Sequence, residues 1–87
     1  MKLPTVLQAF AGGNEKVAIE ATTVGEAFAQ LEREHPALRR RLTDEQGALR
    51  RHVNVYLGND NIRDLDGLDT QLPDDAELLV LPSVAGG

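Results

Sequence analysis

Residues 53–57 read Val-Asn-Val-Tyr-Leu and give the clearest β-strand signal in the chain. Three apolar residues alternate with Asn54 and Tyr56, and β-branched residues suit a pleated, half-buried surface. Because successive side chains of a strand point to opposite faces, the alternation predicts that Val53, Val55 and Leu57 face the core. Tyr56 is then expected to point outward.

The sequence after this strand predicts a turn, an irregular segment and a second turn. Residues 58–61, Gly-Asn-Asp-Asn, are typical of a turn, and residues 62–63 of a short extended piece. The leucines of the irregular segment 64–72 are expected to reach the core: Leu65, Leu68 and Leu72. Residues 73–76 predict a β-turn with Pro73 preset at its second position.

Residues 78–81, Leu-Leu-Val-Leu, are an apolar run that predicts the last strand, lying centrally in the sheet, and Pro82 stops it. If the first and third residues of this run face the core, alternation places Leu79 and Leu81 on the outer face. Together with Tyr56 they would form an apolar patch of the kind that partner proteins cover.

The segment before the central strand predicts two helices. Thr23 and Glu26 have the spacing of a capping box, in which Glu26 reaches back to the Thr23 amide. The apolar residues that follow recur at i, i+3, i+4 and i+7, which makes one helical stripe: Val24, Ala27, Phe28 and Leu31. His35 precedes a proline and ends this helix. Pro36 then opens a short second helical turn with two inward-facing leucines, Leu38 and Leu42.

The first twenty residues predict an N-terminal hairpin. Residues 2–10 are rich in β-formers, although Pro4 restricts them to a strand start, an edge or a bulge. Residues 11–14, Ala-Gly-Gly-Asn, are typical of a turn. Residues 15–20 predict a half-buried strand, because valine and isoleucine alternate there with polar neighbours.

This order of elements indicates one α+β domain, with a helix packed on one face of a small mixed sheet. A length of 87 residues is that of a single domain. The chain contains no cysteine, so disulfides, thiolate metal sites and a thiol nucleophile are excluded. No apolar run approaches the roughly 20 residues that span a bilayer, and no signal-peptide pattern follows Met1, so we expect a cytoplasmic protein.

Charge is distributed unevenly along the chain, whose net charge is −5. Residues 1–32 carry two basic and four acidic side chains, residues 33–52 six and three, and residues 53–87 one and seven. An acidic chain with few aromatic residues argues against nucleic-acid binding. It suits docking onto a positively charged partner surface. The run Arg39-Arg40-Arg41 fits solvated residues at the negative end of a helix better than it fits a phosphate or RNA site.

Nothing in the sequence predicts a catalytic residue or a metal site. Neither His35 nor His52 has an acidic or cysteine partner at ligand spacing, so surface or structural roles are expected for both. No nucleophile and base set is present either. We therefore expect a binding protein or co-substrate rather than an enzyme.

The element order and a tail ending in Gly86-Gly87 resemble the ubiquitin-like β-grasp sulfur carriers. This family includes the small subunit of molybdopterin synthase, the carrier of thiazole synthesis and a carrier used in one route to cysteine. The resemblance covers essentially the whole chain, and the residues that carry it most specifically are 52–57, 61–63, 72–75 and 81–87. The N-terminal Leu3-Pro4-Thr5-Val6-Leu7, with Gly12-Gly13, is most similar to the cysteine-route carrier. The family resemblance implies a β-grasp domain over residues 1–82, with four to five strands and one main helix, and a flexible tail at 83–87.

The resemblance also implies a chemistry for Gly87. An E1-like adenylyltransferase would use ATP and magnesium to form an acyl-adenylate on the Gly87 carboxylate. Sulfide or a persulfide donor would then displace AMP and leave a thiocarboxylate, which a sulfur-accepting biosynthetic enzyme consumes. A metalloprotease that trims the tail is a further partner of this type. The chain itself would bind no cofactor, metal, nucleic acid or membrane.

The tail residues Val84, Ala85 and Gly86 would then occupy a narrow channel in the partner, since a residue without Cβ passes where others clash. In this family, partner contacts also occur at the position of Leu81. Two alternatives stay open: a ubiquitin-like modifier conjugated through Gly87, and a non-covalent β-grasp interaction module with an idle tail. The identity of the sulfur acceptor is open as well.

Overall fold

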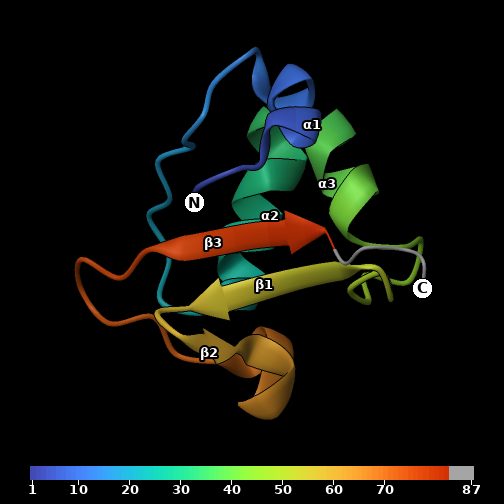
Figure 1. The fold of residues 1–87 in the computed structure, drawn as a ribbon. Helices are drawn as coiled ribbons and strands as arrows, with labels where there is room; N and C mark the ends of the chain where they lie inside the picture. The colour runs from blue at the N-terminus through green and yellow to red at the C-terminus, as the bar shows by residue number, and fades with distance from the viewer. Residues whose placement is uncertain (83–87) are drawn as a thin grey trace.

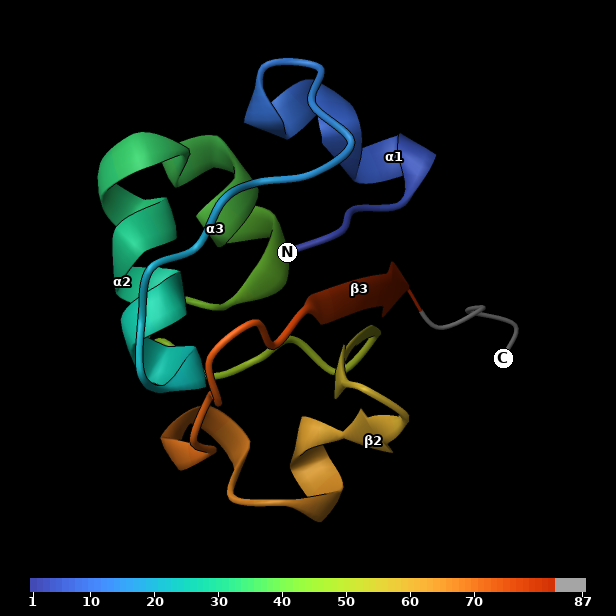
Figure 2. The same cartoon turned by 90° about the vertical axis from the view of Figure 1, so that its left-hand side faces the viewer.

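The computed structural model describes residues 1–82; the tail residues 83–87, and the expectation of flexibility made for them, lie outside the described part. A three-stranded antiparallel sheet in the order β2-β1-β3 forms one layer, and α2 and α3 lie together on one side of it (Figures 1 and 2). The strands are β1 (Val53–Leu57), β2 (Asp60–Asn61) and β3 (Leu78–Pro82).

The predicted strands β1 and β3 are confirmed, and they pair with each other along their whole length. Val55 lies opposite Val80, and both side chains are fully buried. Val53 and Leu78 are buried as well, while Leu57 is half-buried and packs against the core. The period-2 alternation therefore assigned the core face of both strands correctly.

The N-terminal hairpin predicted over residues 2–20 is reduced to one isolated bridge, and neither residues 2–10 nor residues 15–20 form a strand. Only Lys2 bridges neighbouring segments, parallel to Leu79 and antiparallel to Lys16. The chain then turns into α1 (Thr5–Gln8) and a 3-10 helix (Ala9–Ala11). The cause is Pro4, which has no amide to continue a ladder and stands extended before the helix, where its carbonyl accepts from the Leu7 amide at 3.0 Å.

The Lys2 bridges still complete a mixed sheet. The Lys2 amide donates to the Leu78 carbonyl at 2.7 Å, and the Val80 amide donates to the Lys2 carbonyl at 3.0 Å, which is the slanted pattern of parallel strands. β3 is therefore central, as predicted, between β1 and the N-terminal segment. The sheet has three full strands and two bridged segments where four to five strands were expected.

The main helix α2 (Val24–Glu34) begins where the capping signal placed it. The Thr23 hydroxyl accepts from the Glu26 amide at 3.1 Å, and the predicted stripe Val24, Ala27, Phe28 and Leu31 is buried. One detail of the capping box is wrong: the Glu26 carboxylate accepts from the Thr22 amide and hydroxyl, at 3.0 and 2.8 Å, and not from the Thr23 amide. These hydrogen bonds lower the pKa of Glu26, the amide of Thr22 more than its hydroxyl.

The second helix, α3 (Pro36–Leu42), is also confirmed and is longer than the single turn expected. His35 ends α2, and Pro36 opens α3, because proline at the first position of a helix loses no hydrogen bond. Leu38 and Leu42 are fully buried. α3 thereby directs its three consecutive arginines toward the surface at its C-terminal end.

The segment after β1 differs from prediction by two residues. The extended pair is Asp60–Asn61, while residues 62–64 form a 3-10 helix instead of the extended piece expected at 62–63. The Asn61 side chain caps this helix by accepting from the Arg63 amide at 2.9 Å. A local side-chain hydrogen bond of this kind competes with strand pairing, which is why the strand stops early.

Two further expectations for this segment need correction. Leu65 is 42% exposed and is not a core contact, whereas Leu68 and Leu72 pack against the core as predicted. The β-turn at residues 73–76 is present, but the Ala76 amide donates to the Pro73 carbonyl at 3.1 Å, so proline occupies the first position and not the second. Asp75 takes the left-handed conformation, with φ of 63°.

Candidate docking surface at the end of β3

The outer face of β1 and β3 carries the three residues predicted as a docking patch. Tyr56 and Leu79 lie directly opposite each other and are both half-buried. Leu81 lies opposite Asn54 and is 41% exposed, one of few large apolar side chains so exposed in the described part of the chain. The structure thus brings Tyr56, Leu79 and Leu81 together on one face, and we call them the outer-face patch.

A polar network borders this patch on the side of β2. The Asn54 side-chain oxygen accepts from the Arg63 guanidinium at 2.8 Å and from the Asn61 amide group at 3.2 Å. Arg63 also donates to the Arg50 carbonyl at 2.6 Å. These contacts place the Arg63 guanidinium beside Asn54, the residue that lies opposite Leu81.

Sequence reasoning gave no role to the residues of this network. Strand alternation does place Asn54 on the same face as Tyr56, and that signal was available. Arg63 was not predictable as a neighbour of Leu81, since it comes from a 3-10 helix whose position depends on the Asn61 cap.

The predicted tail residues, Val84, Ala85, Gly86 and Gly87, lie outside the described residues. What the structure does place is their point of departure. β3 ends at Pro82, which lies opposite Val53, and Leu81 immediately precedes this last strand residue. The outer-face patch therefore lies beside the point from which the chain continues past Pro82.

The described part of the chain offers binding surfaces and no recognisable reaction centre. Within residues 1–82, no three His, Cys, Asp or Glu side chains are close enough to hold a metal ion. No helix of these residues is both long enough and apolar enough to cross a bilayer. An exposed leucine flanked by a half-buried tyrosine and a fixed arginine has the composition of a protein–protein contact, in which aromatic and arginine side chains are enriched.

The fold and this surface define a ubiquitin-like β-grasp domain, in which one helix crosses a mixed sheet and the last strand leads to the C-terminal residues. The comparison with family models agrees with that class. The ThiS family model matches residues 1–87, and the chain belongs to the ThiS family.

Individual relatives point to two kinds of ubiquitin-like protein. Sulfur carrier protein CysO of Mycobacterium tuberculosis is 34% identical over 89 aligned residues, covering 100% of this chain and 96% of the relative. The solved Amycolatopsis orientalis BexX/CysO complex contains a chain with a TM-score of 0.88 and 35% identity, covering 99% of this chain and 96% of that one. Small archaeal modifier protein 3 of Haloferax volcanii is 42% identical over 65 residues, covering 75% of this chain and 70% of the relative.

Proposed function

We propose that this chain is a sulfur carrier protein whose Gly87 carboxylate is converted to a thiocarboxylate. Similarity over the full length to proteins named sulfur carriers supports the proposal. The observation that carries it is the position of Gly86-Gly87: the pair follows the last strand so closely that Gly87 is the fifth residue after Pro82. Five extended residues reach at most about 18 Å, which would let Gly87 enter a partner protein while the folded domain stays outside.

The chemistry follows from what a carboxylate lacks. Its negative charge and poor leaving group resist attack, so an E1-like adenylyltransferase first joins Gly87 to the AMP part of ATP and releases pyrophosphate. Sulfide then attacks the acyl carbon and AMP leaves, which gives the thiocarboxylate directly. A persulfide donor would instead give an acyl disulfide as AMP leaves, and a thiol of the donor protein would then release the thiocarboxylate by forming a disulfide with the donor sulfur. Two easier acyl steps replace one difficult transfer. ATP and magnesium belong to the activating enzyme in this scheme, so this chain is a co-substrate and not an enzyme.

The chain's own contribution is to present the tail. The outer-face patch of Tyr56, Leu79 and Leu81 docks on the partner, while Val84, Ala85 and Gly86 occupy a channel that excludes water. A solved complex, BexX/CysO, contains a chain that this one resembles over its whole length, and this supports a protein partner for the patch. A biosynthetic enzyme accepts the sulfur, and cytoplasmic location fits such partners.

Intact mass spectrometry of the protein purified from its native host tests the proposal. A mass increase equal to the replacement of one oxygen by one sulfur, located on the C-terminal peptide, is the expected result. Incubation with the host's activating enzyme, ATP, magnesium and sulfide should produce the same species, and omission of ATP should prevent it. Loading that never occurs with the complete mixture would contradict the proposal.

A second function is supported by one specific relative, the small archaeal modifier protein of Haloferax volcanii. A modifier shares the adenylation step and differs only in the nucleophile, which is a lysine amine of a target protein. The same mass spectrometry separates the two, because a modifier yields peptides in which Gly87 is joined to lysine through an isopeptide bond.

A further inference from the structure

A concave basic surface with a lining distinct from the outer-face patch lies near the end of β3. It is a pocket of about 510 Å³ between α3 and the residues that lead into β1. Its lining combines three arginines and a histidine with two apolar residues: Arg40, Arg41, Arg50, His52, Phe10 and Ala37. We call it the basic pocket.

The basic pocket is tied to the end of β3 by the backbone. The Arg50 amide donates to the Leu42 carbonyl at 2.9 Å, which joins the pocket wall to the end of α3. The Val53 amide donates to the Arg50 carbonyl at 3.0 Å, and Val53 lies opposite Pro82. Because Pro82 is the last residue of β3, the pocket borders the place where the chain continues toward Gly87.

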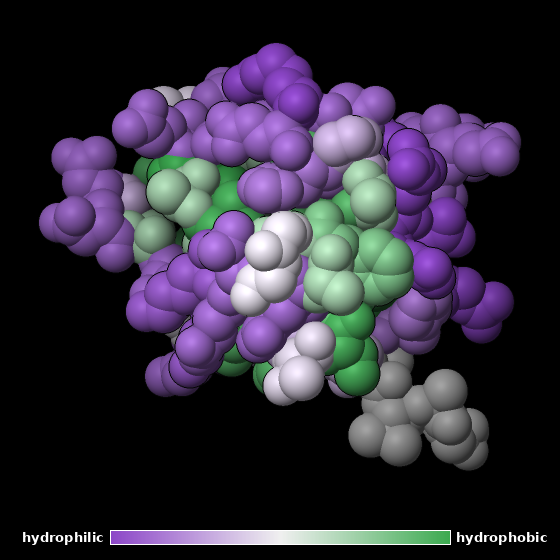
Figure 3. Space-filling view, turned by 90° about the horizontal axis from the view of Figure 1, so that it is seen from above, coloured by the Kyte–Doolittle hydropathy of each residue, from purple (hydrophilic) through white to green (hydrophobic). Residues whose placement is uncertain are grey.

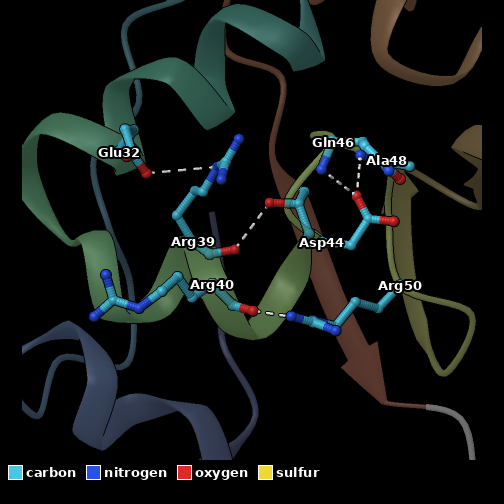
Figure 4. Close-up of polar contacts among 8 residues, drawn as sticks. Glu32, Arg39, Arg40, Asp44, Gln46, Ala48 and Arg50 are labelled. Carbon is cyan, nitrogen blue, oxygen red and sulfur yellow. Dashed lines mark hydrogen bonds and ion pairs between the residues drawn. The ribbon is translucent and has the colours of Figure 1, made fainter.

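Two of the three pocket arginines make side-chain contacts other than ion pairs. The Arg41 guanidinium lies 4.5 Å from the centre of the Phe10 ring, a cation–π contact. The Arg50 Nε donates to the Arg40 carbonyl at 2.9 Å (Figure 4). Within residues 1–82, no carboxylate lies in salt-bridge range of any of these three arginines, whereas Arg39 pairs with Glu32 at 3.5 Å. Figure 4 shows the Arg39 and Arg40 side chains leaving α3 in different directions.

This concentration of positive charge contrasts with the rest of an acidic protein, whose net charge is −5. In Figure 3, strongly hydrophilic residues lie along the right-hand side, toward which β3 points in Figure 1, and also at the upper edge. The other end of β3 adjoins Asp74, Asp75 and Glu77. Like charges repel one another, so the three arginines of the basic pocket are electrostatically most stable when a negatively charged group binds between them.

We propose that the basic pocket is an interaction surface for a carboxylate-rich surface of the protein that receives the tail. The inference rests on the proposed function, because that function brings a partner protein to the end of β3. The outer-face patch then supplies apolar contact area, and the basic pocket supplies charge complementarity that speeds encounter and fixes orientation. An acidic partner surface would be attracted to this pocket and repelled by Asp74, Asp75 and Glu77 at the other end of β3, so at this end the pocket reverses the positively charged partner surface expected from net charge.

The geometry favours spread carboxylates over a compact phosphate group. Arg40 and Arg41 belong to the last turn of α3, and a helix C-terminal end offers carbonyl groups in place of the free backbone N–H groups with which helix N-termini bind phosphate. Arg50 reaches the pocket from a different segment, and its Nε is occupied by the Arg40 carbonyl. Because the arginines come from two segments and line an open pocket, they can pair with several carboxylates at separate points of a protein surface.

Nuclear magnetic resonance of the isotope-labelled chain tests the pocket directly. A hexaglutamate peptide should shift backbone amide signals of residues 37–41 and 50–52, and hexalysine should instead shift those of residues 73–77. Added salt should reduce both effects, because the charges are exposed. The proposal is overturned if hexaglutamate leaves the pocket signals unchanged. It is equally overturned if an oligonucleotide of matched charge binds there more tightly than hexaglutamate does.

Loading kinetics with the host's activating enzyme test the role of the pocket in docking. Arg40→Glu is the informative change, because the Arg40 side chain has no hydrogen bond or ion pair with any other residue in the range 1–82. Its matched control is Arg33→Glu. Both residues are exposed arginines in the last turn of a helix, but Arg33 lies outside the pocket. We expect Arg40→Glu to raise KM about three- to tenfold at low salt and much less at high salt, with kcat unchanged.

The outcomes separate this inference from the proposed function. Equal KM values for Arg40→Glu and Arg33→Glu, with loading otherwise intact, overturn the docking role alone. Absence of loading in the unchanged protein overturns the proposed function, while the peptide titration still reports on the pocket. Thermal unfolding of both variants checks that each is folded at the assay temperature.

Discussion

The two ends of β3 differ in almost every physical property. At its start, Leu78 is 3% exposed, and its carbonyl accepts from the Lys2 amide at 2.7 Å. The Met1 amine beside it is buried and donates to the Val17 carbonyl at 2.8 Å. At its end, Leu81 is 41% exposed and Pro82 is exposed as well. The charge differs too, with acidic residues at the start and the basic pocket at the end.

This difference indicates a division of work along a single strand. The start of β3 is enclosed by the N-terminal segment and contributes to folding stability. The end of β3 leaves an apolar side chain in solvent, which costs hydrophobic stabilisation that burial would have provided. A strand of five residues therefore joins a structural end to an end that is available for partners.

The largest expected effect separates function from stability completely. Deletion of Gly86 and Gly87 should abolish thiocarboxylate loading by the activating enzyme, because it removes the reacting carboxylate from its proposed position. The free energy of unfolding should be unchanged within error, since both residues lie beyond the last strand. Mass spectrometry and urea unfolding measure the two quantities. A deletion variant that is still loaded would show that the reacting carboxylate is not that of Gly87.

The next largest effect concerns the structural end. Leu78→Ala should lower the free energy of unfolding by about 2–4 kcal/mol, because it removes a buried side chain and leaves a cavity. Leu81→Ala in the same strand should lower it by less than about 0.5 kcal/mol, the usual range for exposed positions. Urea unfolding of both variants measures the contrast. Similar losses at the two positions would contradict the division of β3 into a structural and a free end.

A third effect belongs to the free end. Leu81→Ala should raise the KM for the activating enzyme about tenfold. This corresponds to a loss of about 1.4 kcal/mol of binding free energy, as expected when one side chain is removed from the centre of an interface. Its control is Val6→Ala on α1, which removes an apolar side chain that is 68% exposed and far from β3 in sequence. Steady-state loading rates measure both. An equal rise in KM for the control would show that general surface hydrophobicity, and not the outer-face patch, controls docking.

The β3 end that carries the patch was also the part best predicted from sequence. Alternation along β1 and β3 placed Tyr56, Leu79 and Leu81 on the outer face, because one face of each strand is buried against α2 and the register leaves no choice. The cap at Thr23 and the helix boundary at His35 were predictable for a similar reason, since local hydrogen bonding and proline sterics decide them.

The parts that sequence did not predict depend on contacts between distant segments. Residues 2–10 have strand-like composition, yet only Lys2 pairs, because Pro4 interrupts the ladder and the following residues fold into helix. The basic pocket was hidden because the arginines at 39–41 form one run in sequence. In the structure they diverge, one to Glu32 and one to Phe10, and Arg50 joins from another segment.

The smallest expected effect tests the structural end by pH. Burial lowers the pKa of the Met1 amine below its ordinary value of 8.0; Glu77 opposes this shift, and Lys16 adds to it. The unfolded chain therefore binds more protons than the folded one between the lowered pKa and 8.0, so the free energy of unfolding should rise with pH across that window and level off above it. Urea unfolding at pH values on both sides of 8.0 measures the rise.

An N-acetylated chain, which has no amine to titrate, is the matched control, because it retains an N–H for Val17 and shares every other titrating group. If both proteins show the same pH dependence, the amine is not titrating in a buried site, and the start of β3 is more open than its contacts indicate.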